Sequence, residues 1–130
     1  MNGPRYRLSY GRRWWWAAAL WAGLIFWLSS SPDAQGGVNL LDLIPYGDKL
    51  AHAAAFGLLA SFIYLASRGA WLAVVAASLY GVTDELHQHF VPGRTADVAD
   101  WIADTAGAAL LTLLVRYLTR YRAETAEPLQ

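Results

Sequence analysis

Four long apolar stretches constrain the fold of this chain more than any other feature. We expect helices over about 14–30, 50–67, 70–90 and 98–118. Each is close to the ~20 residues that a helix needs to cross a hydrocarbon layer of ~30 Å. A soluble four-helix bundle needs a polar face on every helix, which these stretches lack. The sequence therefore predicts an all-α membrane protein with four transmembrane helices packed as a small bundle, in a single domain over 1–130.

Composition supports this class and excludes others. Hydrophobic residues make up 56% of the chain and charged residues 15%, whereas soluble domains average about 25% charged. High apolar content with zero net charge excludes a disordered chain, and no basic stripe suggests a nucleic-acid partner. The chain has no Cys, which excludes disulfides and thiolate metal ligands. The first stretch also resembles a secretory signal, but its Trp content and the lack of an A-x-A site favour a retained helix.

The distribution of charge predicts how the helices are oriented. Positively charged residues favour cytoplasmic segments. With the N-terminus inside, the cytoplasmic segments hold Arg5, Arg7, Arg12, Arg13, Arg68, Arg116, Arg120 and Arg122, and the outer segments hold Lys49 and Arg94. Most acids fall on the outer side, namely Asp33, Asp42, Asp48, Asp84, Glu85, Asp97, Asp100 and Asp104, whereas Glu124 and Glu127 are inside. We therefore expect a multi-pass protein of the plasma membrane with both termini cytoplasmic and membrane lipids as its surroundings.

Rows of small residues predict close helix packing. Such residues recur every four positions at Ala53, Gly57 and Ser61, at Ala73, Ala77 and Gly81, and at Ala103 and Gly107. Small residues at this spacing let helix backbones approach closely in lipid. The abundance of Ala accounts for part of this pattern. We nevertheless expect the last three helices to form a tight cluster, with a tight turn at Arg68-Gly69.

Polar residues near the predicted outer ends of the helices form the candidate site. Charges inside membrane helices are costly and often functional. The candidates for acid–base chemistry are Asp84, Glu85, Asp100 and Asp104, and those for ligand binding are Asp48, Lys49, His52, Gln88 and Arg94. Helical spacing puts Asp48 with His52, and Asp84 with Gln88, on shared faces. Arg94, in the connection before the fourth helix, is expected within reach of the carboxylates.

Several chemistries fit this set. Neighbouring carboxylates could act as a general acid and base. His52 with Glu85 or Asp100 could hold a divalent metal, the one cofactor that we consider. Arg94 and Lys49 could bind a phosphate or carboxylate head group. Structural roles compete with these, because Asp48 could cap the second helix and Asp97 and Asp100 could face the positive end of the fourth. Such capping does not explain His52, Asp84, Glu85, Gln88 and Asp104 together.

Four motifs resemble the VanZ-like family of bacterial membrane proteins. They are Leu28-Ser29-Ser30-Ser31-Pro32, Asp48-Lys49-x-x-His52-x-x-x-Phe56-Gly57, Asp84-Glu85-x-x-Gln88-x-Phe90-x-Pro92-Gly93-Arg94 and Asp100-x-x-x-Asp104-x-x-Gly107. Asp104 departs from the family, where Asn is more frequent. The resemblance implies a cell-envelope membrane protein, associated in its namesake with low-level resistance to the glycopeptide antibiotic teicoplanin. It implies no settled biochemical activity.

Two functions remain open at this stage. One is a binding protein whose outer-face pocket takes a lipid head group or a lipid-tailed antibiotic. The alternative is a small membrane hydrolase or transferase that acts on an envelope lipid by carboxylate or metal-assisted chemistry. A transporter is less favoured, because the polar groups in the inner halves of the helices are hydroxyls such as Ser61, Tyr64 and Thr112, which support no ion pathway.

Overall fold

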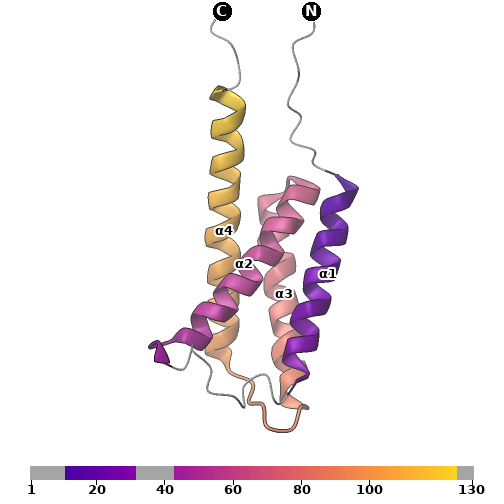
Figure 1. Ribbon diagram of the computed structural model, residues 1–130, viewed down its shortest axis with the longest axis vertical. Coiled ribbons are helices and arrows are strands. Elements are labelled where there is room, and N and C mark those ends of the chain that lie inside the picture. The colour runs from indigo at the N-terminus through magenta and orange to yellow at the C-terminus, as the bar shows by residue number, and fades with distance from the viewer. Residues whose placement is uncertain (1–10, 32–42, 126–130) are drawn as a thin grey trace, which may run out of the picture.

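The computed structural model describes residues 11–31 and 43–125, which form four helices and no strand (Figure 1). These are α1 (Arg12–Ser29), α2 (Gly47–Ser67), α3 (Ala70–His89) and α4 (Val98–Thr125). The predicted all-α fold is confirmed, and so is the position of each helix. The main difference is that α4 ends at Thr125 instead of near residue 118.

The helices run alternately up and down, so their ends gather in two groups (Figure 1). One end of the bundle holds the start of α1, the α2–α3 turn and the end of α4, with the basic residues Arg12, Arg13, Arg68, Arg120 and Arg122. The opposite end holds the acid-rich ends of α2, α3 and α4. The charges are therefore separated as the sequence predicts, although Arg5, Arg7, Asp33, Asp42 and Glu127 lie outside the described residues.

Two of the four helices, α2 and α4, are long and apolar enough to cross a membrane. The most apolar segments of α2 and α4 are only 39% and 28% buried inside the protein, so most of their surface faces outward. Four membrane-spanning helices were predicted, but by length and hydropathy only two of the described helices qualify. The reason is local, because α1 begins with Arg12-Arg13 and α3 ends in the polar run from Asp84 to His89.

The closest helix contact is between α2 and α4, at the predicted small residues. A Cβ added to Gly107 would collide with the backbone of Ala53, and one added to Gly57 would lie 2.9 Å from the Gly107 carbonyl oxygen. On α3, a Cβ at Gly81 would lie 3.0 Å from Asp104 Oδ2. Because the backbones themselves touch, no larger side chain fits between α2 and α4. The prediction of a tight cluster is confirmed.

Side-chain hydrogen bonds fasten α1 to this cluster. Trp21 Nε1 donates to the Ala55 carbonyl oxygen over 2.8 Å, and Tyr80 Oη donates to that of Ala22 over 2.7 Å. The buried apolar core beside these bonds is formed mainly by α2 and α3, with Phe56 almost fully buried. These contacts position the end of α1, with Ser29 and Ser30, against the end of α3.

The α2–α3 turn is as tight as predicted. Arg68 adopts a left-handed conformation with φ 63°, and its N–H donates to the Tyr64 carbonyl oxygen over 2.7 Å. This bond ends α2 and lets α3 begin at Ala70, so that α3 returns directly along α2.

Candidate functional site

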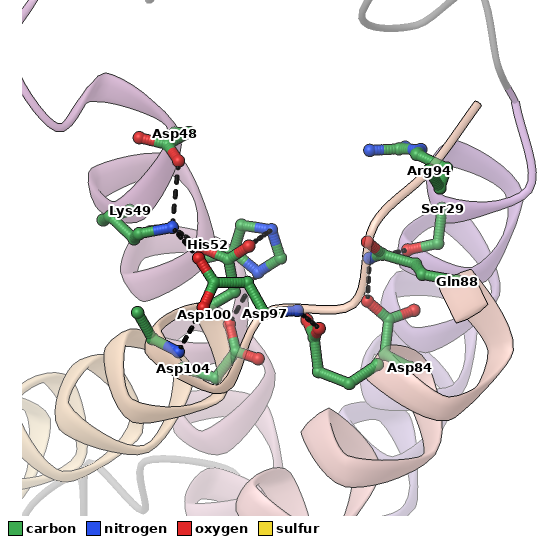
Figure 2. A network of polar contacts seen from close by, with 12 residues as sticks. Ser29, Asp48, Lys49, His52, Asp84, Gln88, Arg94, Asp97, Asp100 and Asp104 are labelled. Atoms are coloured by element: carbon green, nitrogen blue, oxygen red, sulfur yellow. Dashed lines mark hydrogen bonds and ion pairs between the residues drawn. The ribbon is translucent and has the colours of Figure 1, made fainter.

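Polar side chains from all four helices lie at the acid-rich end of the bundle (Figure 2). The end of α1, the start of α2, the end of α3 and the start of α4 each contribute, together with the connection before α4. Two groups form there, with Glu85 between them. The first surrounds Lys49 and His52, and the second surrounds Gln88.

Lys49 is the centre of the first group, because its ammonium contacts three carboxylates. Nζ lies 3.1 Å from Asp48 Oδ2, 2.9 Å from Asp97 Oδ2 and 2.5 Å from Asp100 Oδ1. Asp48 is therefore paired with its neighbour Lys49, and its side chain does not cap α2. Asp100 is nearly buried, so the Lys49 charge that balances it lies in a region of reduced screening.

His52 joins α2 to a fully buried carboxylate on α4. His52 Nδ1 lies 2.9 Å from Asp104 Oδ1, and Asp104 is 0% exposed. An ionised carboxylate only accepts hydrogen bonds, so Nδ1 carries the proton when Asp104 is ionised. In the neutral imidazole Nε2 then keeps its lone pair, and it lies 3.9 Å from Asp100 Oδ2.

Glu85 connects α3 to the start of α4. Its Oε2 accepts a hydrogen bond of 2.7 Å from the backbone N–H of Asp97. Asp97 in turn caps α4, since its Oδ1 accepts the Ala99 N–H over 2.8 Å. That N–H, followed by the Lys49 ammonium, holds the pKa of the Asp97 carboxyl below its usual value.

The second group fixes the ends of α1 and α3 together. Gln88 Nε2 donates to Asp84 Oδ2 over 2.9 Å and to Ser29 Oγ over 3.4 Å. The predicted Asp84–Gln88 pairing is therefore present. Arg94 Nη2 donates to the Leu28 carbonyl oxygen over 2.7 Å. The expected placement of Arg94 among the carboxylates is wrong, because its guanidinium bonds to the end of α1. Arg94 lies beside Ser29, apart from Lys49 and Asp100 (Figure 2).

Three buried carboxylate oxygens have no hydrogen-bond partner among the described residues. They are Asp84 Oδ1, Glu85 Oε1 and Asp104 Oδ2. A buried acceptor without a partner costs about 1–3 kcal/mol. Because buried polar groups are usually satisfied, these oxygens are positions where a water, a proton or a ligand with donors or positive charge would bind.

An apolar cleft of about 330 Å³ opens beside Glu85, between α3 and α4. It is lined by Val82, Glu85, Ala96, Asp97, Val98 and Trp101. Glu85 therefore belongs both to the polar cluster and to an apolar surface.

Three side chains lie close enough to share a metal ion. One ligand atom each from His52, Glu85 and Asp100 lies within 4.8 Å of the others. The set combines an imidazole nitrogen with carboxylate oxygens, which suits first-row divalent ions.

Sequence reasoning missed several contributors to this region. The cleft residues Val82, Ala96 and Trp101 carry no polar signal in the sequence. Ser29 stands in a recognisable serine run, and Ser30 Oγ lies 2.9 Å from His87 Nε2. Only the packing of α1 on α3 reveals these two contacts.

The fold and site define a small all-helical protein that has two candidate membrane spans and a buried acidic cluster at one end. The chain belongs to the VanZ/LLP1 family, whose model matches residues 14–119. The predicted family resemblance is thereby confirmed. Searches of curated proteins and of solved structures found no match.

Proposed function

We propose that this VanZ/LLP1-family protein is a multi-pass protein of the bacterial plasma membrane, with both termini cytoplasmic, that binds an amphiphile at its outer face. The separation of basic and acidic residues to opposite ends of the bundle supports this orientation. The apolar outer surface, with Leu20, Leu79 and Leu110 all more than 60% exposed, supports contact with lipid along several helices.

One observation carries the binding proposal, namely the contact of the apolar cleft with the acidic cluster at Glu85. An amphiphile has an apolar chain and a polar end group, and this arrangement offers a surface for each. The chain would lie against Val82, Val98 and Trp101, and the end group would meet the carboxylates. Sites of this kind are mostly apolar with a few placed polar groups.

The charges in the site restrict the end group. Lys49 already contacts three carboxylates, and Arg94 donates to the end of α1. Neither cation is in position for an anionic head group alone. The unpartnered oxygens of Glu85 and Asp104 instead favour an end group with hydrogen-bond donors or one that arrives with a cation.

The physiological ligand in this proposal is a lipid head group or a lipid-tailed antibiotic. The family name suggests a link to teicoplanin resistance or to envelope homeostasis. Retention of a lipid-tailed glycopeptide at the outer face would lower the amount that reaches its target.

A second candidate function is hydrolysis or group transfer on an envelope lipid. The contact of His52 with Asp104, beside the unpartnered Glu85, favours it, because a carboxylate-oriented imidazole is a common general base. Conversion of an envelope lipid by the purified protein, abolished in Glu85→Gln, would support this reaction over binding alone.

Native mass spectrometry of the purified protein tests the binding proposal. We expect the wild type to retain an amphiphile and Ala96→Trp to lose it, because the indole would fill the cleft. Ala19→Trp, an equal change at an exposed position of α1, should retain it. Equal retention by all three proteins, or by none, would contradict the proposal.

A further inference from the structure

We propose that His52, Glu85 and Asp100 bind a first-row divalent metal ion, whose open coordination position faces the cleft. This inference rests on the proposed function, because it names what joins the acidic cluster to the end group of the amphiphile. The three residues come from α2, α3 and α4, so the ion would join three helices.

Each of the three side chains is held by one atom and leaves a second atom uncommitted. His52 is held through Nδ1 by Asp104, Glu85 through Oε2 by the Asp97 N–H, and Asp100 through Oδ1 by Lys49. The remaining atoms are His52 Nε2, Glu85 Oε1 and Asp100 Oδ2. Fixing one atom of a ligand by hydrogen bonding while the other coordinates is the usual arrangement around protein-bound metals.

A buried, unpartnered oxygen gives independent support. Glu85 is only 8% exposed, and its Oε1 has no hydrogen-bond partner among residues 11–31 and 43–125. Lys49 contacts Asp48, Asp97 and Asp100 but is not the partner of Glu85. Glu85 Oε1 is therefore free to coordinate a cation.

The spacing allows an ion with a small movement of the side chains. Ligand atoms bound at ~2.1 Å lie no more than ~4.2 Å apart. One ligand atom from each of the three side chains lies within 4.8 Å of the others, and His52 Nε2 lies 3.9 Å from Asp100 Oδ2. The ligand atoms therefore need to approach one another by well under ~1 Å. Glu85 and Lys49-bound Asp100 lie at helix ends, where rotamer changes achieve this without moving a helix.

The types of ligand atom determine which metal ions the site prefers. Asp104 has a separate role, which is to orient His52. Imidazole nitrogen favours Mn²⁺ to Zn²⁺ over Ca²⁺ and Mg²⁺, whose sites are built from oxygen. Asp104 accepts the Nδ1–H of His52, which orients Nε2 and makes the imidazole a better ligand. Three protein ligands leave a position for water or for an oxygen of the end group.

Metal titration of the full-length protein in nanodiscs tests the inference. We expect Mn²⁺ and Zn²⁺ to bind with one ion per chain, and Mg²⁺ to bind far more weakly. His52→Ala and Glu85→Gln should lose the ion, and Asp104→Asn should weaken binding by about 10- to 100-fold. Glu124→Gln removes one negative charge at an exposed position near the end of α4, at the opposite end of the bundle, so it should bind as the wild type does.

A second measurement does not depend on whether these variants fold. Bound Mn²⁺ in the wild type should give an electron spin-echo modulation from one directly coordinated ¹⁴N, because His52 is the expected nitrogen ligand. Absence of this signal, a Glu85→Gln variant that binds normally, or equal losses in Glu124→Gln would each overturn the inference. Amphiphile retention is measured separately with Ala96→Trp. Metal binding without a retained amphiphile would therefore contradict the proposed function alone, and a retained amphiphile without metal would contradict this inference alone.

Discussion

Replacing Gly107 with Ala should destabilise the protein, because the α2–α4 contact has no space for a methyl group. The added Cβ would collide with the backbone of Ala53, and a backbone atom cannot rotate away as a side chain can. Overpacking of this kind costs about 1–3 kcal/mol. Ala is about 1 kcal/mol better than Gly inside a helix. A collision with backbone takes the upper overpacking cost of about 3 kcal/mol. Subtracting the ~1 kcal/mol that Ala gains over Gly in a helix leaves a net loss of about 2 kcal/mol in the free energy of unfolding.

The same change should disturb the site. Asp104 lies one turn before Gly107 on α4, and His52 is adjacent to Ala53 on α2. Helices that separate at Gly107 would lengthen the 2.9 Å contact between His52 Nδ1 and Asp104 Oδ1. The ¹⁵N NMR shift of His52 Nδ1 should therefore move towards that of an imidazole without a fixed partner.

Reversible unfolding in mixed micelles, followed by Trp fluorescence, measures the loss of stability. Gly23→Ala, on α1, is the matched control, because a Cβ added at Gly23 would have no neighbouring atom within 4 Å. It should leave the protein unchanged or slightly more stable. A Gly107→Ala variant that is as stable as Gly23→Ala would refute the packing argument.

Three further predictions concern charge and orientation. Lys49→Ala should lower the free energy of unfolding by about 1–2 kcal/mol, because Asp100 loses its cation. This value lies between the ~1 kcal/mol of a surface ion pair and the ~3–5 kcal/mol lost when a buried pair is broken. Adding Asp100→Asn should recover part of this loss. Asp97 has a lowered pKa in the folded protein, so its stabilising effect is present above the usual value of ~3.9 and is lost as the pH falls through the lower, folded value. Acid unfolding of Asp97→Asn should therefore be less steep in this range, and an identical profile would contradict the assignment. Because the chain has no Cys, single cysteines report orientation. An impermeant maleimide should label Thr95→Cys in intact cells and Glu124→Cys only after lysis, and the reverse pattern would exclude cytoplasmic termini.

The helices and the close contacts were predictable because they depend on local patterns. Apolar stretches bounded by turns placed α1 to α4, and four-residue spacing of small residues located Gly57 and Gly107 in the α2–α4 contact. The Asp84–Gln88 hydrogen bond also follows from helical spacing. The end of α4 was placed too early. Arg116 and Arg120 mark the end of the apolar stretch, but the helix itself continues through these arginines to Thr125.

The partners of the charged residues could not be predicted, because they depend on how distant segments pack. Arg94 contacts the carbonyl of Leu28, far away in the sequence, and Lys49 is the residue that gathers the carboxylates. Helical periodicity assigns a residue to a face but does not identify the facing helix. The cleft beside Glu85 likewise arises only when Val82 of α3 meets Val98 of α4.

Photocrosslinking in living cells tests the central claim most directly. A benzophenone amino acid at Val98, inside the cleft, is compared with one at Leu110, further along α4; the native residues are 69% and 67% exposed. We predict that Val98 gives one dominant lipid or amphiphile adduct, lost in the Glu85→Gln background, whereas Leu110 gives a mixture that matches the bulk membrane. The same bulk mixture at both positions would contradict selective binding of an amphiphile beside the acidic cluster.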